Sequence, residues 1–370
     1  MVAIASASSA GPYDWLMPMQ PSPSAETSSP WDPNLRCCIA VPSITSFAPR
    51  YPGVLLPRKP IGERLRRQRS PGYAAGCGGP GCGGRQVSCD WLLIDGSSMI
   101  FRAFYGVPAS VRGPDGQPVN AIRGFLDALA RLVVQRRPRQ LAVASDEDWR
   151  PAWRVELIPA YKAHRVAEPV PPGLAPQMEV IAEILRAVGV DQVGVADHEA
   201  EDVIATWSAL TGGTVEVVSG DRDLFALVED PRVRVLYPEK GGLAVVEEAE
   251  VTRRYGVPGR RYADFAVLRG DPSDGLPGLR GVGAAKAAEL IRRHGGLAEV
   301  IRDAPLGEAD RDYLARAMRV VEPVLDLPIT LPAGRRNRYP ADPAAVAALA
   351  ARYGVKGACD RLVAVLAAMG

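Results

Sequence analysis

The chain has 370 residues, of which 47% are hydrophobic and 23% charged, a composition typical of a globular protein with one large or two small domains. Its net charge of +2 excludes a strongly basic surface overall, so any contact with nucleic acid must come from local clusters of Arg and Lys. No run of about 18 apolar residues occurs, and we therefore expect no membrane span.

The N-terminal segment differs in composition from the rest of the chain. Residues 1–88 contain 13 of the 34 prolines and show no hydrophobic periodicity. We predict that residues 1–86 are a disordered leader rich in Pro, Gly and Ser, or the product of a misplaced start codon, and not a secretory signal. Cys77, Cys82 and Cys89 raise the alternative of a zinc site, but their spacing fits no standard zinc motif, so free thiols of an intracellular protein are expected.

From Val87 onward, short apolar runs alternate with amphipathic segments. Strands are predicted at 87–94, 141–144, 190–195, 215–218, 224–228 and 233–237. Helices are predicted at 99–104, 119–135, 174–188, 247–255, 261–268, 312–324 and 343–353. This alternation predicts an α/β fold with a parallel, doubly wound sheet and right-handed crossovers. The last part of the chain, residues 309–370, is predicted to be helical and to have only a packing role.

Acidic residues follow the predicted strands. Because the carboxyl ends of parallel strands open on one edge of a sheet, we expect these side chains to converge. The acids expected there are Asp95, Asp146, Glu199, Glu201, Asp202, Asp221 and Asp223. So many carboxylates in one cleft need compensating positive charge near neutral pH, which a divalent cation supplies. For Asp95 alone, capping of the next helix is an equally good interpretation.

The segment from Glu199 to Trp207 places three acids at the start of an apolar helix. These acids either form a solvent-exposed first turn stabilised by the helix dipole or hold a divalent cation. The acids that follow the other strands favour the cation. A set of ligands that offers only carboxylate oxygens favours Mg²⁺ or Mn²⁺ over zinc. His198 is expected to lie beside the site and not to be a ligand.

Cationic and aromatic residues are interspersed in the segment 149–165. This combination suits phosphate pairing and base stacking. The alternative is an amphipathic surface helix whose Lys and Arg side chains extend over apolar neighbours. The prolines of 169–172 break the chain after it, so we expect the whole stretch to be a mobile excursion from the core.

Residues 279–291 carry a helix–hairpin–helix signature. The Gly281-Val282-Gly283 turn is predicted to expose backbone N–H groups at a helix N-terminus, where they can bind a DNA phosphate. Lys286 adds a cation in the first turns of that helix. Asp271 and Asp274 precede the turn and strengthen the prediction.

Taken in order, these motifs resemble the 5′–3′ exonuclease family, which comprises the N-terminal nuclease domain of bacterial DNA polymerase I, phage exonucleases and flap endonucleases. The resemblance extends from about residue 87 to 325. Its motifs are Ile-Asp-Gly at 94–96, Phe-Arg-Ala-Phe at 101–104, Trp-Arg-Val-Glu-Leu at 153–157, Glu-Ala-Glu-Asp-Val at 199–203, Ser-Gly-Asp-Arg-Asp at 219–223, Gly-Asp-Pro-Ser-Asp at 270–274 and Gly-Val-Gly-x-x-Lys at 281–286. It implies a PIN-like catalytic domain over 87–256, with a basic arch at 147–172, and a helix–hairpin–helix and helical region over 257–370.

The resemblance also implies a role for each motif residue. Ligands of a first metal ion would be Asp95, Asp146, Glu199 and Glu201, with Asp202 in support. Those of a second ion would be Asp221, Asp223, Asp271 and Asp274. Residues directed at substrate phosphates would be Arg102, Arg154, Lys162 and Arg165. Residues that grip the duplex would be Gly281, Gly283 and Lys286, at a turn where some relatives hold K⁺. The ions would be two Mg²⁺, which Mn²⁺ can replace.

The implied activity is structure-specific, two-metal hydrolysis of DNA as a 5′–3′ exonuclease and 5′-flap endonuclease, in replication and repair. The resemblance implies a stand-alone monomer at the bacterial nucleoid, with 5′-ended or flapped DNA as substrate and a separate DNA polymerase as partner. Two positions depart from the family pattern: Glu201 stands where bacterial relatives mostly carry Asp, and Gly275 replaces the usual Asn, which affects the hydrogen bonding of its loop. A PIN-like ribonuclease is disfavoured by the hairpin and the basic arch, and a catalytically silent DNA-binding module by the retained acids.

Overall fold

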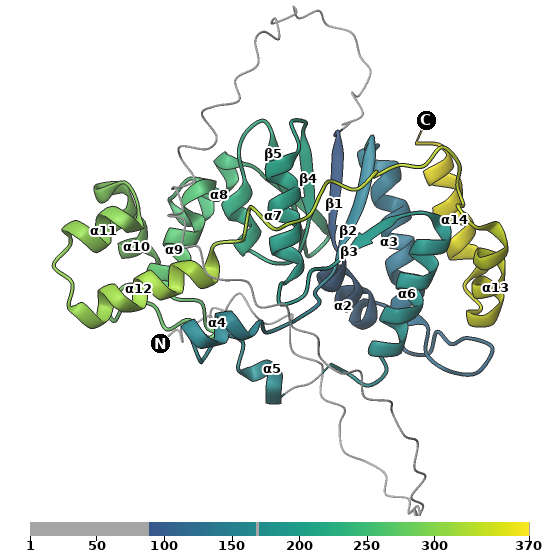
Figure 1. Ribbon diagram of the computed structural model, residues 1–370, viewed down its shortest axis with the longest axis horizontal. Helices are drawn as coiled ribbons and strands as arrows, with labels where there is room; N and C mark the ends of the chain where they lie inside the picture. Colours follow the sequence, from purple (N-terminus) through teal and green to yellow (C-terminus); the bar gives the residue numbers. More distant parts are fainter. Residues whose placement is uncertain (1–88, 168–169, 370) are drawn as a thin grey trace, which may run out of the picture. The chain divides into compact units, whose positions relative to one another are not determined.

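A six-stranded sheet runs through the part of the chain that the computed structural model describes, residues 89–167 and 170–369 (Figure 1). Its strands, in the spatial order β3-β2-β1-β4-β5-β6, are β1 (Trp91–Asp95), β2 (Gln140–Ala144), β3 (Asp191–Val193), β4 (Val215–Val218), β5 (Val233–Glu239) and β6 (Gly242–Val246). The first five are parallel and β6 is antiparallel to β5. The predicted parallel α/β sheet is therefore confirmed, with an antiparallel edge strand in addition.

One predicted strand is wrong. Residues Asp223–Leu227 form a 3-10 helix, η2, and the strand that completes the sheet is β6, which was not predicted. The hairpin before β6 turns at Gly241 and Gly242, whose φ angles are 98° and 154°. The error arises because Leu224 and Phe225 are fully buried, and periodicity cannot distinguish a short buried helix from a short buried strand.

The register of the central strands determines where their ends lie. Ile94 of β1 is level with Val143 of β2 on one side and with Val218 of β4 on the other. All three strands are buried on both faces, which is typical of a parallel sheet covered by helices. The residues that follow these three strands consequently share one edge of the sheet.

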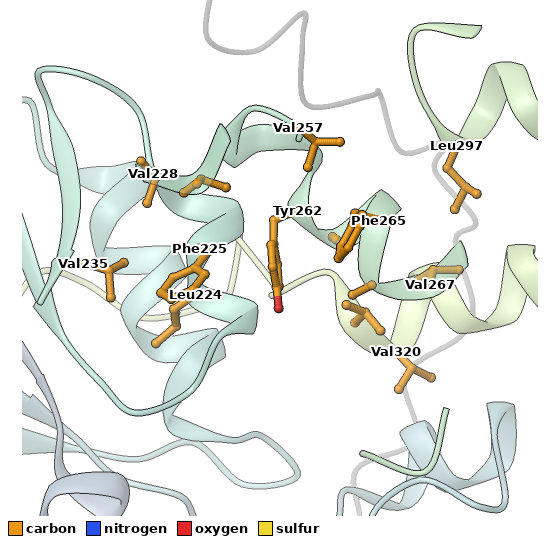
Figure 2. Packing of buried hydrophobic residues seen from close by; sticks show 14 of the residues in the cluster. Leu224, Phe225, Val228, Val235, Val257, Tyr262, Phe265, Val267, Leu297 and Val320 are labelled. Atoms are coloured by element: carbon orange, nitrogen blue, oxygen red, sulfur yellow. The ribbon is translucent and has the colours of Figure 1, made fainter. Parts of the chain in front are cut away.

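Helices cover both faces of the sheet and form two hydrophobic clusters. The helices are α2 (Gly96–Gly106), α3 (Asn120–Arg136), α4 (Ala152–Leu157), α5 (His164–Ala167), α6 (Ala175–Val188), α7 (Ala200–Leu210), α8 (Glu248–Tyr255), α9 (Tyr262–Arg269), α10 (Ala284–His294), α11 (Leu297–Asp303), α12 (Glu308–Val321), α13 (Pro343–Tyr353) and α14 (Lys356–Ala367), with 3-10 helices η3 (Gly259–Arg261) and η4 (Pro272–Asp274). One cluster includes residues of α2, α3, α6, α13 and α14, and the other includes residues of α7 to α12. Figure 2 shows part of the second cluster, around Phe225, Tyr262 and Phe265.

The C-terminal residues are less continuously helical than predicted. Residues 322–342 contain no helix, so that part of the prediction is wrong, whereas α12 and α13 confirm the predicted helices at 312–324 and 343–353. Helix α14 packs against α3, and α13 packs against α6 (Figure 1). The predicted domain division at residue 256 stays a prediction.

The predicted leader, residues 1–86, lies outside the described residues, as do Cys77 and Cys82. Of the described helices, none is both long enough and apolar enough to cross a membrane.

Candidate functional site

Asp95 lies at the carboxyl end of β1, and its side chain connects this strand to α2 and to the residue that follows β4. One carboxylate oxygen accepts a hydrogen bond of 2.9 Å from the Ser98 backbone N–H and thereby caps α2, as one of the two interpretations predicted. The other accepts a 2.5 Å bond from the Ser219 hydroxyl, which follows β4. Burial, with repulsion from Asp146 and Asp221, raises the pKa of Asp95 to about 7. Asp95 therefore both caps α2 and belongs to a cluster of acidic residues.

Three further carboxylates converge at this edge of the sheet. Glu201, Asp221 and Asp223 each offer an oxygen within 4.8 Å of the others. They come from the first turn of α7, the loop after β4 and the first residue of η2. Burial and the surrounding acids raise the pKa of Glu201 and of Asp223 well above the ordinary values. Asp146, whose oxygen accepts a 2.7 Å bond from the Ala200 N–H at the start of α7, has a raised pKa as well, mainly because of burial.

The acidic start of α7 is buried, so the solvent-exposed alternative is wrong. Glu199, Glu201 and Asp202 are 3%, 5% and 0% exposed. Arg154, which is itself 0% exposed, forms ion pairs with all three, at 2.7 Å from Glu201 and 2.8 Å from Asp202. One guanidinium thus offsets part of the charge of three carboxylates and holds them in place.

Asp202 has partners on three separate segments of the chain. Its carboxylate pairs with Arg154, accepts a 2.8 Å hydrogen bond from the Val324 N–H and lies 3.0 Å from His198 Nδ1. His198 therefore contacts Asp202, and the prediction that it lies beside the site and is not a ligand stays a prediction. The arrangement makes Asp202 an anchor for Arg154.

The basic segment lies against the acids. Lys162 is 1% exposed, which makes the surface-helix alternative wrong for Lys162 and for Arg154. The Lys162 ammonium group donates a hydrogen bond to Glu199, and Arg165 Nη1 lies 3.6 Å from the same side chain. Tyr161, for which no role was predicted, donates its hydroxyl to Glu199 at 2.5 Å. These side chains are held in place by burial and by their contacts with Glu199. Neither the burial nor the contacts can be recognised in a local sequence pattern.

Two acids of the loop after α9 complete the site. Asp271 accepts a 3.2 Å hydrogen bond from Arg222, and the Lys162 backbone N–H donates to the Asp274 carbonyl at 3.0 Å. Asp274 is buried, and burial together with repulsion from Asp221 raises its pKa although the Lys162 charge lowers it. The loop therefore joins the basic segment to the acidic cluster.

Gly275 has a steric role that the sequence does not reveal. Its φ angle is +72°, and a Cβ atom placed on it would lie only 1.9 Å from the Ala160 carbonyl oxygen. A side chain here, such as the asparagine that the family resemblance leads one to expect, could therefore not be accommodated without moving Ala160 and the Lys162 segment. The loop is close to the basic segment because this residue has no side chain.

The predicted hairpin has the expected backbone geometry. Gly281 has a φ angle of +73°, and α10 begins at Ala284, directly after Gly283. Apart from their chain neighbours, no described residue has an atom within 4 Å of a Cβ atom placed on either glycine, and Lys286 is exposed on α10. The turn and the start of the helix thus face open space, as contact with a DNA phosphate requires. Arg102, on α2, is also exposed.

The acids present fit divalent cations. Five of them form no ion pair with any Lys, Arg or His among the described residues: Asp95, Asp146, Asp221, Asp223 and Asp274. Carboxylate oxygens alone make up this donor set, which suits divalent cations that prefer oxygen ligands. The Cys89 thiol is buried beside Glu216, and burial raises its pKa, so it is poorly suited to bind a metal as thiolate.

The family model of the 5′-3′ exonuclease N-terminal resolvase-like domain matches residues 90–256. A 5′-3′ exonuclease of Streptomyces coelicolor is 49% identical over 302 residues, which span 75% of this chain and 100% of that relative. The chain belongs to the 5′–3′ exonuclease family. A second member, the 5′-3′ exonuclease of Mycobacterium tuberculosis, is 45% identical over 304 residues that cover 73% of this chain and 96% of that protein. The DNA polymerase I of Mycobacterium bovis is 38% identical over 252 residues, which cover 64% of this chain and 27% of the polymerase.

Solved structures of flap endonucleases share the fold of this exonuclease. The flap endonuclease of bacteriophage T5, in a complex with DNA and metal ions, superposes with a TM-score of 0.54 at 18% identity and covers 75% of this chain and 98% of its own. Flap endonuclease-1 of Methanococcus jannaschii superposes with a TM-score of 0.50 at 18% identity. The match covers 76% of this chain and 94% of the endonuclease. The predicted PIN-like fold is thereby confirmed.

Proposed function

We propose that this 5′–3′ exonuclease hydrolyses DNA phosphodiesters by a structure-specific, two-metal mechanism, as an exonuclease and on 5′ flaps. The observation that carries the proposal is the convergence of Glu201, Asp221 and Asp223, for which the described residues offer no cationic partner except Arg154 at Glu201. Carboxylates this close repel one another unless positive charge is supplied, which is the condition that a divalent ion meets. The T5 relative, described as bound to DNA and metal ions, supports the same chemistry.

The acids would hold the ions in two groups. The first group would be Asp95, Asp146, Glu199 and Glu201, with Asp202 supporting through Arg154. The second group would be Asp221, Asp223, Asp271 and Asp274. When bound, Mg²⁺ ions acidify water and stabilise the charge that develops on phosphate. The hydrogen bonds from Ser98, Ser219 and Ala200 keep Asp95 and Asp146 directed at the common edge of the sheet.

The cations would divide into two roles according to their exposure. Arg154 and Lys162 are buried on the acids and would orient Glu199 and its neighbours. Arg102 and Arg165 reach solvent and would contact the phosphates that flank the scissile bond. Gly281, Gly283 and Lys286 would grip the duplex, with K⁺ bound at the turn.

The wider context is proposed on the same basis. The similarity to part of a DNA polymerase I supports a role in replication and repair beside a separate polymerase. We expect a monomer that acts on 5′-ended or flapped DNA at the bacterial nucleoid, in the cytoplasm.

A cleavage assay with the purified protein tests the proposal. The substrates are 5′-flap DNA, blunt duplex DNA and single-stranded RNA, each with Mg²⁺ or with EDTA. Cleavage of flap or duplex DNA from the 5′ end, with Mg²⁺ only, is expected, and Asp221→Ala and Glu199→Ala should abolish it. Asp360→Ala, at an exposed ion pair with Lys356, is the control. Preferential cleavage of RNA would favour a PIN-like ribonuclease, and DNA binding without cleavage would favour the silent module.

A further inference from the structure

Helix α12 contacts both the hairpin loop and the basic segment through side chains on one of its faces. The Tyr313 hydroxyl accepts a 2.9 Å hydrogen bond from the Gly278 backbone N–H, which lies just before the Gly281 turn. Arg316 Nη1 donates a 2.8 Å bond to the carbonyl oxygen of Leu157, the last residue of α4. Because residues three positions apart lie on the same side of a helix, one face of α12 reaches both segments.

The bond from Arg316 lies at the open end of a short helix. α4 has six residues, and an isolated helix of that length is not stable, so its position depends on tertiary contacts. α4 packs against α12 (Figure 1). The last carbonyl groups of a helix have no partner within it, and a guanidinium group that binds one of them fixes where that end of the helix lies.

Arg154 connects this support to the acidic site. It lies on α4, three residues before Leu157. Its guanidinium group forms ion pairs with Glu199, Glu201 and Asp202. A displacement of α4 would therefore also move the positive charge that orients these three carboxylates.

The hairpin is joined to α12 by packing as well as by the Tyr313 hydroxyl. Val282 of the turn is buried in the same hydrophobic cluster as Leu314 and Ala317 of α12. Ile158, which follows α4, belongs to that cluster too. The two segments that the proposed function assigns to DNA, the hairpin and the basic segment, are thus connected through one helix although they are distant in sequence.

We propose that Arg316 and Tyr313 are positioning residues, which hold the basic segment in a fixed place relative to the hairpin. A duplex bound at the turn then meets acids that Arg154 has already oriented. The inference rests on the proposed function, because it requires DNA to bind at the hairpin and the acids to take part in cleavage. Misplacing a group near a reacting centre by about 1 Å can lower a rate by up to about 100-fold.

Two substitutions break the connection at its two ends. Arg316→Met removes the guanidinium group and keeps an apolar stem, and Tyr313→Phe removes only the hydroxyl. Single-turnover cleavage of 5′-flap DNA with Mg²⁺ should slow by about tenfold in the first variant and about threefold in the second. The protein concentration that gives the half-maximal rate should change by less than about twofold, because the hairpin residues remain. The double variant should be no slower than Arg316→Met, since both changes break the same connection.

Asp312→Asn is the matched control on the same helix. Asp312 is 62% exposed and pairs with Arg316 at 2.8 Å, so its replacement leaves the bond to Leu157 in place and should not change the cleavage rate. Circular dichroism at the assay temperature establishes that each variant is folded. An unchanged rate in Arg316→Met, an equal loss in the control, a loss confined to DNA binding, or losses that multiply in the double variant would each overturn the positioning role.

The assay also separates this inference from the proposed function. If the unsubstituted protein does not cleave DNA, the proposed function fails together with the inference. If it cleaves DNA and both single variants cleave at the same rate, only the inference fails.

Discussion

Replacing Asp95 by Asn should stabilise the ion-free protein although it removes a proposed metal ligand. Burial, with repulsion from Asp146 and Asp221, raises the pKa of Asp95 from 3.8 to about 7. Each pKa unit corresponds to about 1.4 kcal/mol, so keeping this carboxylate ionised destabilises the fold by about 4 kcal/mol above pH 7. In the proposed function, a bound cation would remove this cost.

The effect should depend on pH in a defined direction. The native state binds the Asp95 proton more tightly than the unfolded state does, so the contribution to stability falls as pH rises from about 4 to 7 and is constant above that. Asparagine has nearly the same size and cannot ionise. Its amide must replace bonds from Ser98 and Ser219, so we expect a gain of about 2–4 kcal/mol at pH 8 and about 1–2 kcal/mol or less at pH 5.

Urea unfolding in EDTA at pH 8 and pH 5, followed by circular dichroism, measures the free energy of unfolding of both proteins. Asp360→Asn makes the same chemical change at an exposed position and should alter stability by no more than about 0.5 kcal/mol. Mg²⁺ should stabilise the unsubstituted protein more than Asp95→Asn. A variant less stable than the unsubstituted protein at pH 8, or equally stabilised at both pH values, would refute this electrostatic reasoning.

Three further predictions concern the basic segment, the loop after α9 and the hairpin. Arg154→Met should lower the free energy of unfolding by about 3–5 kcal/mol, because it leaves three buried carboxylates without their shared counter-ion; a loss below about 1 kcal/mol in urea would contradict this. Gly275→Ala should destabilise more than Gly281→Ala, since both residues have φ angles near +70° but only the first meets the Ala160 carbonyl; equal losses in thermal unfolding would show that the contact is unimportant. Lys286→Ala should weaken binding to duplex DNA. It should also reduce the slope of the logarithm of affinity against the logarithm of salt concentration by about 1, and an unchanged slope, measured by fluorescence anisotropy, would show that the duplex does not contact Lys286.

The sequence alone was sufficient for the five parallel strands of the sheet and for the edge at which its acids gather. Runs of apolar residues followed by Asp95, Asp146 or Asp221 require strands whose carboxyl ends share one edge, and the parallel pairing of β1, β2 and β4 has that consequence. The capping of α2 by Asp95 could be recognised because a cap involves residues three positions apart. These features depend on local patterns or on general rules of parallel sheets.

Other features were decided only by tertiary contacts. Arg154 and Lys162 look like surface cations in sequence, and only the approach of α7 from about 40 residues further along shows them to be buried counter-ions. The clash that excludes a side chain at Gly275 involves Ala160, more than 100 residues earlier in the chain. The Tyr262 hydroxyl, which hydrogen-bonds with no described residue, is enclosed by the packing of α9 against η2. Periodicity reports which face of a segment is apolar, whereas the energy of a buried charge or hydroxyl depends on groups that only the fold brings near it.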